Sequence, residues 1–584
     1  MSLRATKVGR ATPGKPALAP ARDRIARLAS YHAVIALVLY VGASLLIERQ
    51  VIVHLGSVCA CDGTSDSTQY IWALVWFPHA ILHGLNPLYS HAIWTPGGLN
   101  LAGATAVPAA AIAAWPITAL AGPVAAYNVL SILSPVAGAF SAYRLCHYVT
   151  RSPWASVLAG FLYGFSTYEF AAMQEHLHLV FIFCPPLAVL LVLKRLDHAI
   201  SARRFIVLMA VVLSLQMLLS TEILFTMTCL GVVVLAAAAT FAARSERSAI
   251  FELLPALAGA YLATAVICSW FLYAAARAPA FAQGWGTRFP ADAVSFFVPS
   301  AITRLGGYSF LSVTSAFRGS LTESGTYLGL PLILIVAIFL ITRWRARAAK
   351  VIAATLVVSL VWSLGDSLYI AGHQTITLPW ALLNSLPLLD LLIPERIALY
   401  TALGCAIVAA LWLSSSEAGT RRRWALALLA VVFIVPTADA ATNRGRTPVL
   451  DAPWSAPAFF SSGTYKRYLH RDEIVLPLPW GRSGNSLLWQ AQADMYFRLA
   501  SGYFGPPPPS YWREQPIVYE LKFNYPGPGA PRGLRRFLAQ HQVADVIVEQ
   551  ARAGPWPRLL MQAGLRRAVA AGGVFVYHVP RAGL

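Results

Sequence analysis

Apolar runs long enough to cross a lipid bilayer recur along this chain from Tyr31 to Thr437. A transmembrane helix needs about 20 apolar residues to span a hydrocarbon core roughly 30 Å thick. Only 12% of the residues are charged, whereas about 25% are charged in ordinary soluble domains. We therefore predict an α-helical polytopic membrane protein. About eleven spans are expected, at residues 30–48, 124–146, 153–170, 177–194, 204–221, 223–243, 252–275, 325–342, 351–370, 397–415 and 424–440.

Basic clusters between these runs predict which ends of the spans face the cytoplasm. They occur at alternate connections: Arg144 and Arg151, 194–204, Arg244 and Arg247, 343–350, and 421–423. The positive-inside rule places the basic tail at 1–29 inside and the C-terminus outside. The apolar, proline-containing segment 104–122 is interpreted as an interfacial or re-entrant helix, because counting it as a span would invert every later loop. These clusters also explain the net charge of +20, so we expect membrane lipids as partners and no nucleic acid.

Residues 441–584 differ in composition from the transmembrane domain at 30–440, because charged residues, proline and tryptophan return. Three short apolar runs predict strands, and two further segments have helical spacing. The strands are expected at 473–478, 543–548 and 574–579, and the helices at 533–542 and 556–567. We predict a soluble C-terminal α/β domain. It is placed outside the cell, because long domains translocate largely regardless of their charge.

The first external loop, at 49–123, has no lysine or arginine after Arg49. A helix is expected from about Ser67 to His83, ended by Gly84 and the proline that follows. Its tryptophans are typical of a membrane surface, so we expect this helix to lie flat on the bilayer. Cys59 and Cys61 are separated by a single residue, a spacing that predicts no bond between them.

Asp66 stands at the start of this helix, one turn before Tyr70, so both side chains can point to the same side. A carboxylate in that position could act as a general base. The alternative is structural, because Asp66 followed by Gln69 three residues later also resembles a capping box. Asp62 is a weaker candidate, since its sequence CDG is typical of a turn.

One span, a long external loop with a D-x-x-x-Y pattern and then many spans resemble the glycosyltransferase C superfamily. The sequence HGLNPLYSHAIWTPGGLNLAG, at 83–103, is similar to loops of its uncharacterised bacterial members, which are related to protein mannosyltransferases and aminoarabinose transferases. The resemblance implies an enzyme of the bacterial cytoplasmic (inner) membrane. Such an enzyme transfers a sugar from a polyprenyl-phosphate carrier to a glycan, lipid or protein acceptor at the outer face.

The resemblance also implies that Asp66 is the catalytic base, with inversion at the anomeric carbon. Members of the superfamily often have two adjacent acidic residues here, but Ser67 follows Asp66 in this chain. A second carboxylate, and any metal held between two, are therefore left open. We assign no cofactor with certainty, and a divalent metal ion is the one candidate.

Other external polar residues are candidates for substrate binding. Glu175, His176 and His178 share one loop with Glu169, and they could instead anchor helix ends at the interface. Glu222 stands at the next external hairpin, where a capped helix start is the alternative. The resemblance implies that Arg396, at the start of a span, meets the carrier phosphate. Arg304 and Arg288, in the loop at 277–324, could fold over the site and are further candidates. For Arg396 the alternative is an ion pair with Glu395 or Asp390, or contact with lipid headgroups.

Two other functions compete with a glycosyltransferase. One is a transporter or flippase for a lipid-linked glycan, although no inverted repeat is evident and few charges lie within the spans. The other is a non-enzymatic protein of cell-envelope assembly, whose C-terminal domain binds partners.

Overall fold

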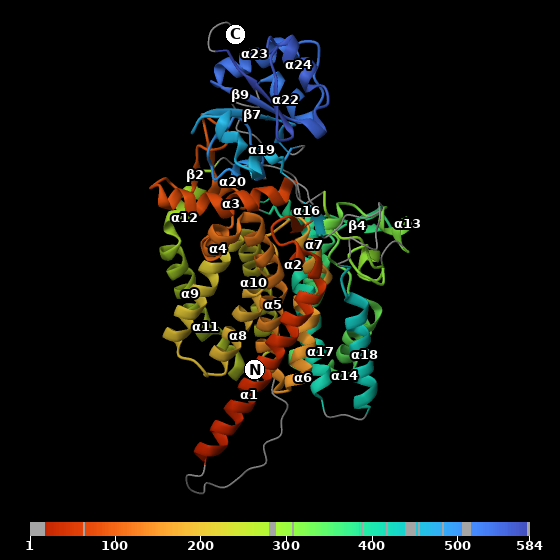
Figure 1. Cartoon of the computed structure of the whole chain (residues 1–584). Helices are drawn as coiled ribbons and strands as arrows, with labels where there is room; N and C mark the ends of the chain where they lie inside the picture. The colour runs from red at the N-terminus through yellow and green to blue at the C-terminus, as the bar shows by residue number, and fades with distance from the viewer. Residues whose placement is uncertain are drawn as a thin grey trace.

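The computed structural model describes residues 18–61, 65–278, 288–306, 309–384, 386, 389–415, 419–437, 451–453, 456–481, 484–504 and 515–580. Asp62, most of the basic tail and the expected domain boundary near 440 lie outside these residues. The described part of the chain consists of a bundle of apolar helices, with a mixed sheet and its helices stacked on one end of the bundle (Figure 1).

Helices of different length form the bundle, and the long ones run side by side through it (Figure 1). The helices are α1 (Leu18–Ile47), α5 (Pro123–Thr150), α6 (Pro153–Gly164), α7 (Thr167–Met173), α8 (Cys184–Leu196), α9 (Ala202–Leu219), α10 (Thr221–Phe241), α11 (Arg244–Ile267), α12 (Ser269–Ala275), α14 (Leu330–Arg343), α15 (Arg347–Ser363), α17 (Ala398–Ser414) and α18 (Thr420–Ile434). Five helical runs are long and apolar enough to cross a membrane by themselves: α5, α9, α10, α11, and η5 (Pro394–Ile397) together with α17. The chain is therefore a membrane protein.

The order of the helices places the basic connections at one end of the bundle. The turns between α8 and α9, α10 and α11, α14 and α15, and α17 and α18 carry the arginines and lysines of the predicted clusters. These turns lie at the end away from the stacked sheet (Figure 1). The basic clusters thus lie at alternate connections between the helices, as the charge pattern predicted.

The first loop forms a layer between the bundle and the sheet. Its elements are α2 (Arg49–Val53), β1 (Val58–Ala60), α3 (Ser65–Leu82), β2 (Tyr89–Ser90), β3 (Leu99–Asn100), η1 (Leu101–Gly103) and α4 (Pro108–Ala121). Helix α3 lies across the end of the bundle (Figure 1). The prediction that its aromatic side chains lie on lipid is wrong, because protein covers Trp72, Trp76 and Phe77, each at most 3% exposed.

Helix α4, within the segment expected to be interfacial or re-entrant, has 14 residues. At 1.5 Å per residue it is about 21 Å long, shorter than the roughly 30 Å of a hydrocarbon core. It packs against α3 and α5.

The long connection between α12 and α17 folds back on the same end of the bundle (Figure 1). Besides α14 and α15 it contains η3 (Ala293–Phe296), α13 (Leu311–Thr314), η4 (Leu321–Glu323), β4 (Ser367–Ile370), β5 (His373–Thr377) and α16 (Trp380–Leu383). Strands β4 and β5 form an antiparallel hairpin.

The C-terminal segment, 456–580, is an α/β structure around a five-stranded sheet in the order β10-β11-β9-β7-β8. Strand β7 is parallel to both of its neighbours, whereas β10, β11 and β9 are paired antiparallel. The elements are α19 (Ala458–Ser461), η7 (Thr464–Arg467), β7 (Ile474–Leu478), α20 (Ser486–Gln492), β8 (Arg498–Leu499), α22 (Pro516–Phe523), α23 (Ala530–Gln540), β9 (Asp545–Glu549), η9 (Gln550–Arg552), α24 (Trp556–Gln562), β10 (Val569–Ala571) and β11 (Val574–His578). Strands β7, β9 and β11 lie where strands were expected.

A buried amide joins this segment to the first loop. The Gln490 side chain accepts a hydrogen bond from Trp72 Nε1 at 2.6 Å. It donates to the carbonyl oxygens of Ala92 and Phe497, at 2.8 and 2.6 Å. All three contacts are enclosed, since Gln490 and Trp72 are both fully buried. The layer and the sheet are therefore held together by polar contacts that water cannot replace.

We expect Gln490→Leu to destabilise the protein by about 2–4 kcal/mol, because an indole N–H and two carbonyl groups would lose their buried partner. Thermal unfolding of the purified protein, followed by tryptophan fluorescence, measures the effect. Gln492→Leu makes the same chemical change two residues later, on a half-buried side chain. An equal loss in both variants would contradict this account.

Two carboxyl groups also meet inside the C-terminal segment. Glu473 precedes β7, and Asp545 begins the neighbouring strand β9, where it is paired with His578. Burial raises the pKa of Asp545 to about 6. Burial, followed by the nearby Asp545 carboxylate, raises the pKa of Glu473 to about 7. Both groups therefore hold protons more tightly in the folded state than in the unfolded chain.

Because these folded-state pKa values lie above the unfolded ones, the stabilisation is complete below pH of about 4 and is lost as the pH rises through 6 to 7. We expect the melting temperature of Glu473→Gln to fall less than that of the unmodified protein between pH 5 and 8. Thermal unfolding across this range provides the test, with Asp494→Asn, an exposed position in the same C-terminal segment, as the matched control. Parallel profiles for Glu473→Gln and the unmodified protein would refute the assignment.

Candidate functional site

Polar side chains from five distant segments gather between α3 and the end of the helix bundle. The segments are the start of α3, the loop between α7 and α8, the start of α10, η4, and η5. Their residues are Asp66, Tyr70, Glu175, His176, His178, Glu222, Thr322, Glu323, Glu395 and Arg396. Seven of these ten residues were expected from the sequence to be catalytic or to bind substrate, and Thr322, Glu323 and Glu395 were not.

Asp66, Glu175 and His176 form the part of this cluster nearest the start of α3. One potential ligand atom from each lies within 4.8 Å of those of the other two. The carboxylate oxygen Oδ1 of Asp66 is buried and has no hydrogen-bond partner among the described residues. Since α3 begins at Ser65, Asp66 lies inside the first helical turn and does not occupy the N-cap position. The capping interpretation therefore does not account for this carboxylate.

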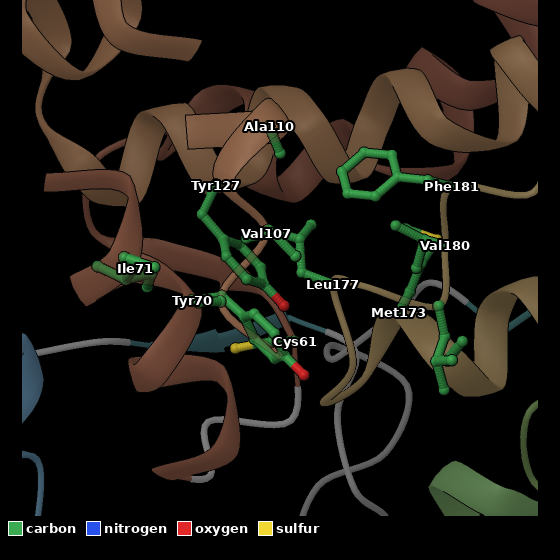
Figure 2. Packing of buried hydrophobic residues seen from close by; sticks show 14 of the residues in the cluster. Cys61, Tyr70, Ile71, Val107, Ala110, Tyr127, Met173, Leu177, Val180 and Phe181 are labelled. Atoms are coloured by element: carbon green, nitrogen blue, oxygen red, sulfur yellow. The ribbon is translucent and has the colours of Figure 1, made fainter. Parts of the chain in front are cut away.

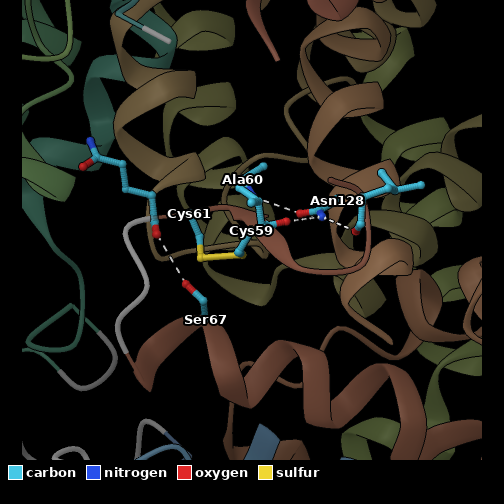
Figure 3. Close-up of a disulfide and its surroundings, with 8 residues drawn as sticks. Cys59, Ala60, Cys61, Ser67 and Asn128 are labelled. Atoms are coloured by element: carbon cyan, nitrogen blue, oxygen red, sulfur yellow. Dashed lines mark hydrogen bonds between the residues drawn. A yellow bond between two sulfur atoms is a disulfide. The ribbon is translucent and has the colours of Figure 1, made fainter. Parts of the chain in front are cut away.

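The start of α3 is fixed by contacts on both sides. The Ser67 hydroxyl donates to the carbonyl oxygen of Gln174 at 3.3 Å, which connects α3 to the loop that carries Glu175 (Figure 3). Thr322 of η4 donates to Glu175 Oε2 at 3.3 Å. These contacts hold Asp66 and Glu175 in place, so the arrangement is set before any substrate arrives.

Two carboxylates and an imidazole are a donor set that suits a divalent cation such as Mn²⁺. The unpartnered Oδ1 of Asp66 fits this role, because a buried carboxylate oxygen normally has a partner. Asp66, Glu175 and His176 would hold the ion. An ion bound there would supply positive charge to neutralise a substrate phosphate.

Tyr70 and His178 form a second contact within the cluster. The Tyr70 hydroxyl lies 2.6 Å from His178 Nδ1, and the two rings are stacked. On its other side, His178 Nε2 is 3.7 Å from a carboxylate oxygen of Glu222. Burial lowers the pKa of His178, and it raises the pKa of Tyr70 well above the ordinary value. Figure 2 shows the Tyr70 side chain packed among Tyr127, Leu177 and other buried residues.

Arg396 is held by two carboxylates. Its Nη2 lies 2.5 Å from Glu323 Oε1, and its Nη1 lies 2.6 Å from Glu222 Oε2. The guanidinium also reaches His176 Nε2 at 3.4 Å. The alternative prediction, that Arg396 forms an ion pair with Glu395 or Asp390, is wrong. The Glu395 carboxylate instead accepts a hydrogen bond from the backbone N–H of residue 325 at 2.6 Å.

Arg396 can bind a phosphate, as expected, only if the phosphate meets a guanidinium that two carboxylates already contact. A phosphate oxygen would compete with Glu222 and Glu323 for the guanidinium, whose side chain is only 11% exposed. Glu222 and Glu323 pair with this single guanidinium, whereas Asp66 and Glu175 lie together beside His176. A cation at the site would therefore be held by Asp66 and Glu175.

Glu323 was not identified from the sequence, although it is the principal partner of Arg396. A signal exists, because Glu323 is the only acidic residue between Asp292 and Asp366. In a stretch this poor in negative charge, an isolated acidic residue indicates a specific partner. Because Glu323 and Arg396 are 73 residues apart in the sequence, local patterns could not identify them as partners.

Two further cationic groups were expected at the phosphate. Arg304 is exposed in a turn whose backbone N–H donates to the carbonyl oxygen of Val435, after α18, and its side chain has no ion pair with the cluster among the described residues. Arg288 is exposed and precedes η3, next to Phe289, whose carbonyl oxygen accepts from the Glu395 N–H at 3.4 Å. The expected role of both arginines at the phosphate stays a prediction.

The prediction that Cys59 and Cys61 do not bond is wrong. The structure joins them in a disulfide, with Cα atoms 5.1 Å apart, within the usual range for such a bond (Figure 3). Strand β1 places them so because it pairs with β6 (Asp451–Pro453). Asn128 of α5 holds the same strand, accepting from the Ala60 N–H at 2.9 Å and donating to the Val58 carbonyl at 2.7 Å.

A helix bundle capped by a transverse first-loop helix is a fold that this chain shares with a solved membrane glycosyltransferase. The mycobacterial arabinofuranosyltransferase AftD has a TM-score of 0.54 and 13% identity, with 94% of this chain and 41% of that chain covered. The present chain thus spans less than half the length of AftD.

Two other solved structures are similar to the chain. The oligosaccharyltransferase of Archaeoglobus fulgidus is 14% identical, with a TM-score of 0.48 and coverage of 94% of this chain and 74% of that one. ArnT from Cupriavidus metallidurans is 11% identical, with a TM-score of 0.48 and coverage of 92% and 97%. No protein-family model matches the sequence. No curated protein matches it by sequence either.

We expect the purified protein to bind Mn²⁺, and Asp66→Asn or His176→Ala to weaken that binding by at least about tenfold, because each removes a ligand. Isothermal titration calorimetry measures the affinity. Asp494→Asn, an exposed substitution in the C-terminal segment, serves as the control. Unchanged Mn²⁺ affinity in both site variants would exclude these residues as ligands.

Proposed function

We propose that the chain is a glycosyltransferase that moves a sugar from a polyprenyl-phosphate carrier to an acceptor hydroxyl, with inversion at the anomeric carbon. The acceptor is a glycan, a lipid or a protein at the external face of the membrane. The observation that carries the proposal is the Asp66 carboxylate, which lies beside Glu175 and His176 with a buried oxygen that has no partner among the described residues.

The chemistry assigned to Asp66 is general base catalysis. The oxygen of the Asp66 carboxylate that does not face the cation position accepts the proton of the acceptor hydroxyl while the hydroxyl oxygen bonds to the anomeric carbon. The bond between that carbon and the carrier phosphate breaks, and polyprenyl phosphate leaves with the electron pair. The products are the glycoside, the free carrier and a protonated Asp66. Direct displacement of this kind inverts the anomeric configuration.

In this proposal the other residues of the cluster hold the site in place and balance its charge. Tyr70 and His178 support the α3 side of the site through their short contact. Arg396 holds the Glu222 and Glu323 carboxylates in ion pairs, whereas Asp66 Oδ1 has no hydrogen-bond partner among the described residues. Glu175 and His176 complete the donor set for a divalent cation.

We also propose the arrangement in the membrane. The chain crosses a bacterial cytoplasmic membrane about eleven times, with the N-terminus inside and the first loop and C-terminal segment outside. The basic turns at the end of the bundle away from the sheet support this orientation. The site then opens on the external face, where a lipid carrier in the bilayer and an external acceptor can meet.

Incubating the purified protein with labelled polyprenyl-phosphate sugars and envelope glycans tests the reaction. We expect transfer by the unmodified protein and by Asp494→Asn. Transfer should fall by about 10²- to 10⁴-fold in Asp66→Asn, because that change removes the base. Undiminished transfer by Asp66→Asn would remove this residue from the mechanism. A donor that crosses vesicle membranes with its sugar–phosphate bond intact would instead indicate a flippase.

A further inference from the structure

A cavity of about 250 Å³ lies beside the cluster, enclosed by the connection between α12 and α14. Its lining is rich in hydroxyl groups, which come from Ser295, Ser300, Thr314, Ser315, Ser320, Ser324 and Thr326. Leu311 and Phe317 supply an apolar part of the wall. A space of this size and polarity can hold a small polar molecule.

One of these hydroxyl groups lacks a partner. Ser300 is only 5% exposed, and its Oγ has no hydrogen-bond partner among the described residues. Ser295 and Thr326, which line the same cavity, are bonded to each other at 2.5 Å. Because Ser300 lines the cavity and its hydroxyl has no partner among the described residues, this hydroxyl can hydrogen-bond to a molecule in the cavity.

The cavity and the cluster share a wall. Glu323 lines the cavity and also binds Arg396, and Glu395 lines it beside them. Thr322, the residue before Glu323, bonds to Glu175 of the donor set. A molecule in the cavity is therefore separated from the Asp66 cluster by single side chains.

The charge of the lining selects the class of ligand. Asp292, Glu323 and Glu395 face the cavity with a single arginine, Arg318, which packs on the Tyr369 ring at 4.8 Å. This balance disfavours an anion, and the hydroxyl groups disfavour a lipid chain. Hydroxyl and carboxylate groups beside an apolar wall match a sugar ring, whose hydroxyls hydrogen-bond while its C–H faces pack against carbon.

We propose that this cavity binds one uncharged or amino sugar ring, of the donor or of the acceptor, and excludes acidic sugars. The proposal deepens the transferase assignment and rests on it for the role of the ligand. The Ser300 hydroxyl bonds to a hydroxyl of the ring, and Phe317 and Leu311 contact its apolar face.

Cysteine protection in the purified full-length protein tests the binding directly. Ser315→Cys places a thiol on the exposed part of the cavity lining, directly after α13, and Ser312→Cys places one within α13 and outside the lining. Each variant is labelled with N-ethylmaleimide, and labelling is measured at the new cysteine by peptide mass spectrometry. The probes are methyl glycosides of neutral and amino sugars, methyl glucuronide, polyprenyl phosphate, and polyprenyl-phosphate sugars.

We expect neutral or amino sugars to slow labelling of Ser315→Cys but not of Ser312→Cys, and methyl glucuronide to slow neither. Protection by free glycosides assigns the cavity to the acceptor. Protection by polyprenyl-phosphate sugars alone, and not by polyprenyl phosphate, assigns it to the donor. Absence of protection by every sugar, or equal protection by methyl glucuronide, overturns the proposal.

Adding Ser300→Ala to Ser315→Cys should raise the half-protecting sugar concentration about three- to tenfold, the loss expected for one hydrogen bond. Ser131→Ala removes another buried hydroxyl with no described partner, in α5, and should leave protection unchanged. Equal effects of the two substitutions would also overturn the proposal. Protection should persist when Asp66→Asn is added, because the cavity does not contain Asp66. In the protein that retains Asp66, protection by sugars without any sugar transfer would contradict the transferase proposal alone. Sugar transfer without protection would contradict the cavity proposal alone.

Discussion

The enclosed ion pairs of Arg396 connect the parts of the chain that make the site. One guanidinium joins η4, the start of α10 and the start of α17, and it reaches the loop that carries His176. Removing either carboxylate would leave charge uncompensated in a region that water scarcely enters, which is strongly unfavourable. The helices of the bundle can therefore vary in their lipid-facing residues while this network keeps the site in register.

Much of the bundle and part of the site could be predicted from sequence, because hydrophobic length and the distribution of arginine are local signals. Asp66, Tyr70, Glu175, His176 and His178 were expected and are brought together. Partners distant in sequence could not be predicted. Periodicity does not reveal which acidic residue meets Arg396, nor does spacing reveal that pairing of β1 with β6 places two neighbouring cysteines for a bond.

The first loop shows why composition alone gave the wrong surroundings for α3. Tryptophan is equally suited to a membrane surface and to a protein interface, since both combine an apolar face with a polar partner. Trp72 finds its partner in Gln490, on a segment whose docking the sequence does not encode locally. The helix lies across the bundle as expected, but the C-terminal segment covers it.

The contact between Trp72 and Gln490 spans 418 residues, which has a consequence for biosynthesis. The layer that carries Asp66 leaves the ribosome early, whereas Gln490 is synthesised 418 residues after Trp72. Until then the apolar surface of α3 lacks this cover, and contacts between residues so far apart form slowly because the intervening chain must first be ordered. The first-loop layer can therefore reach its final structure only after the segment that carries Gln490 has been made.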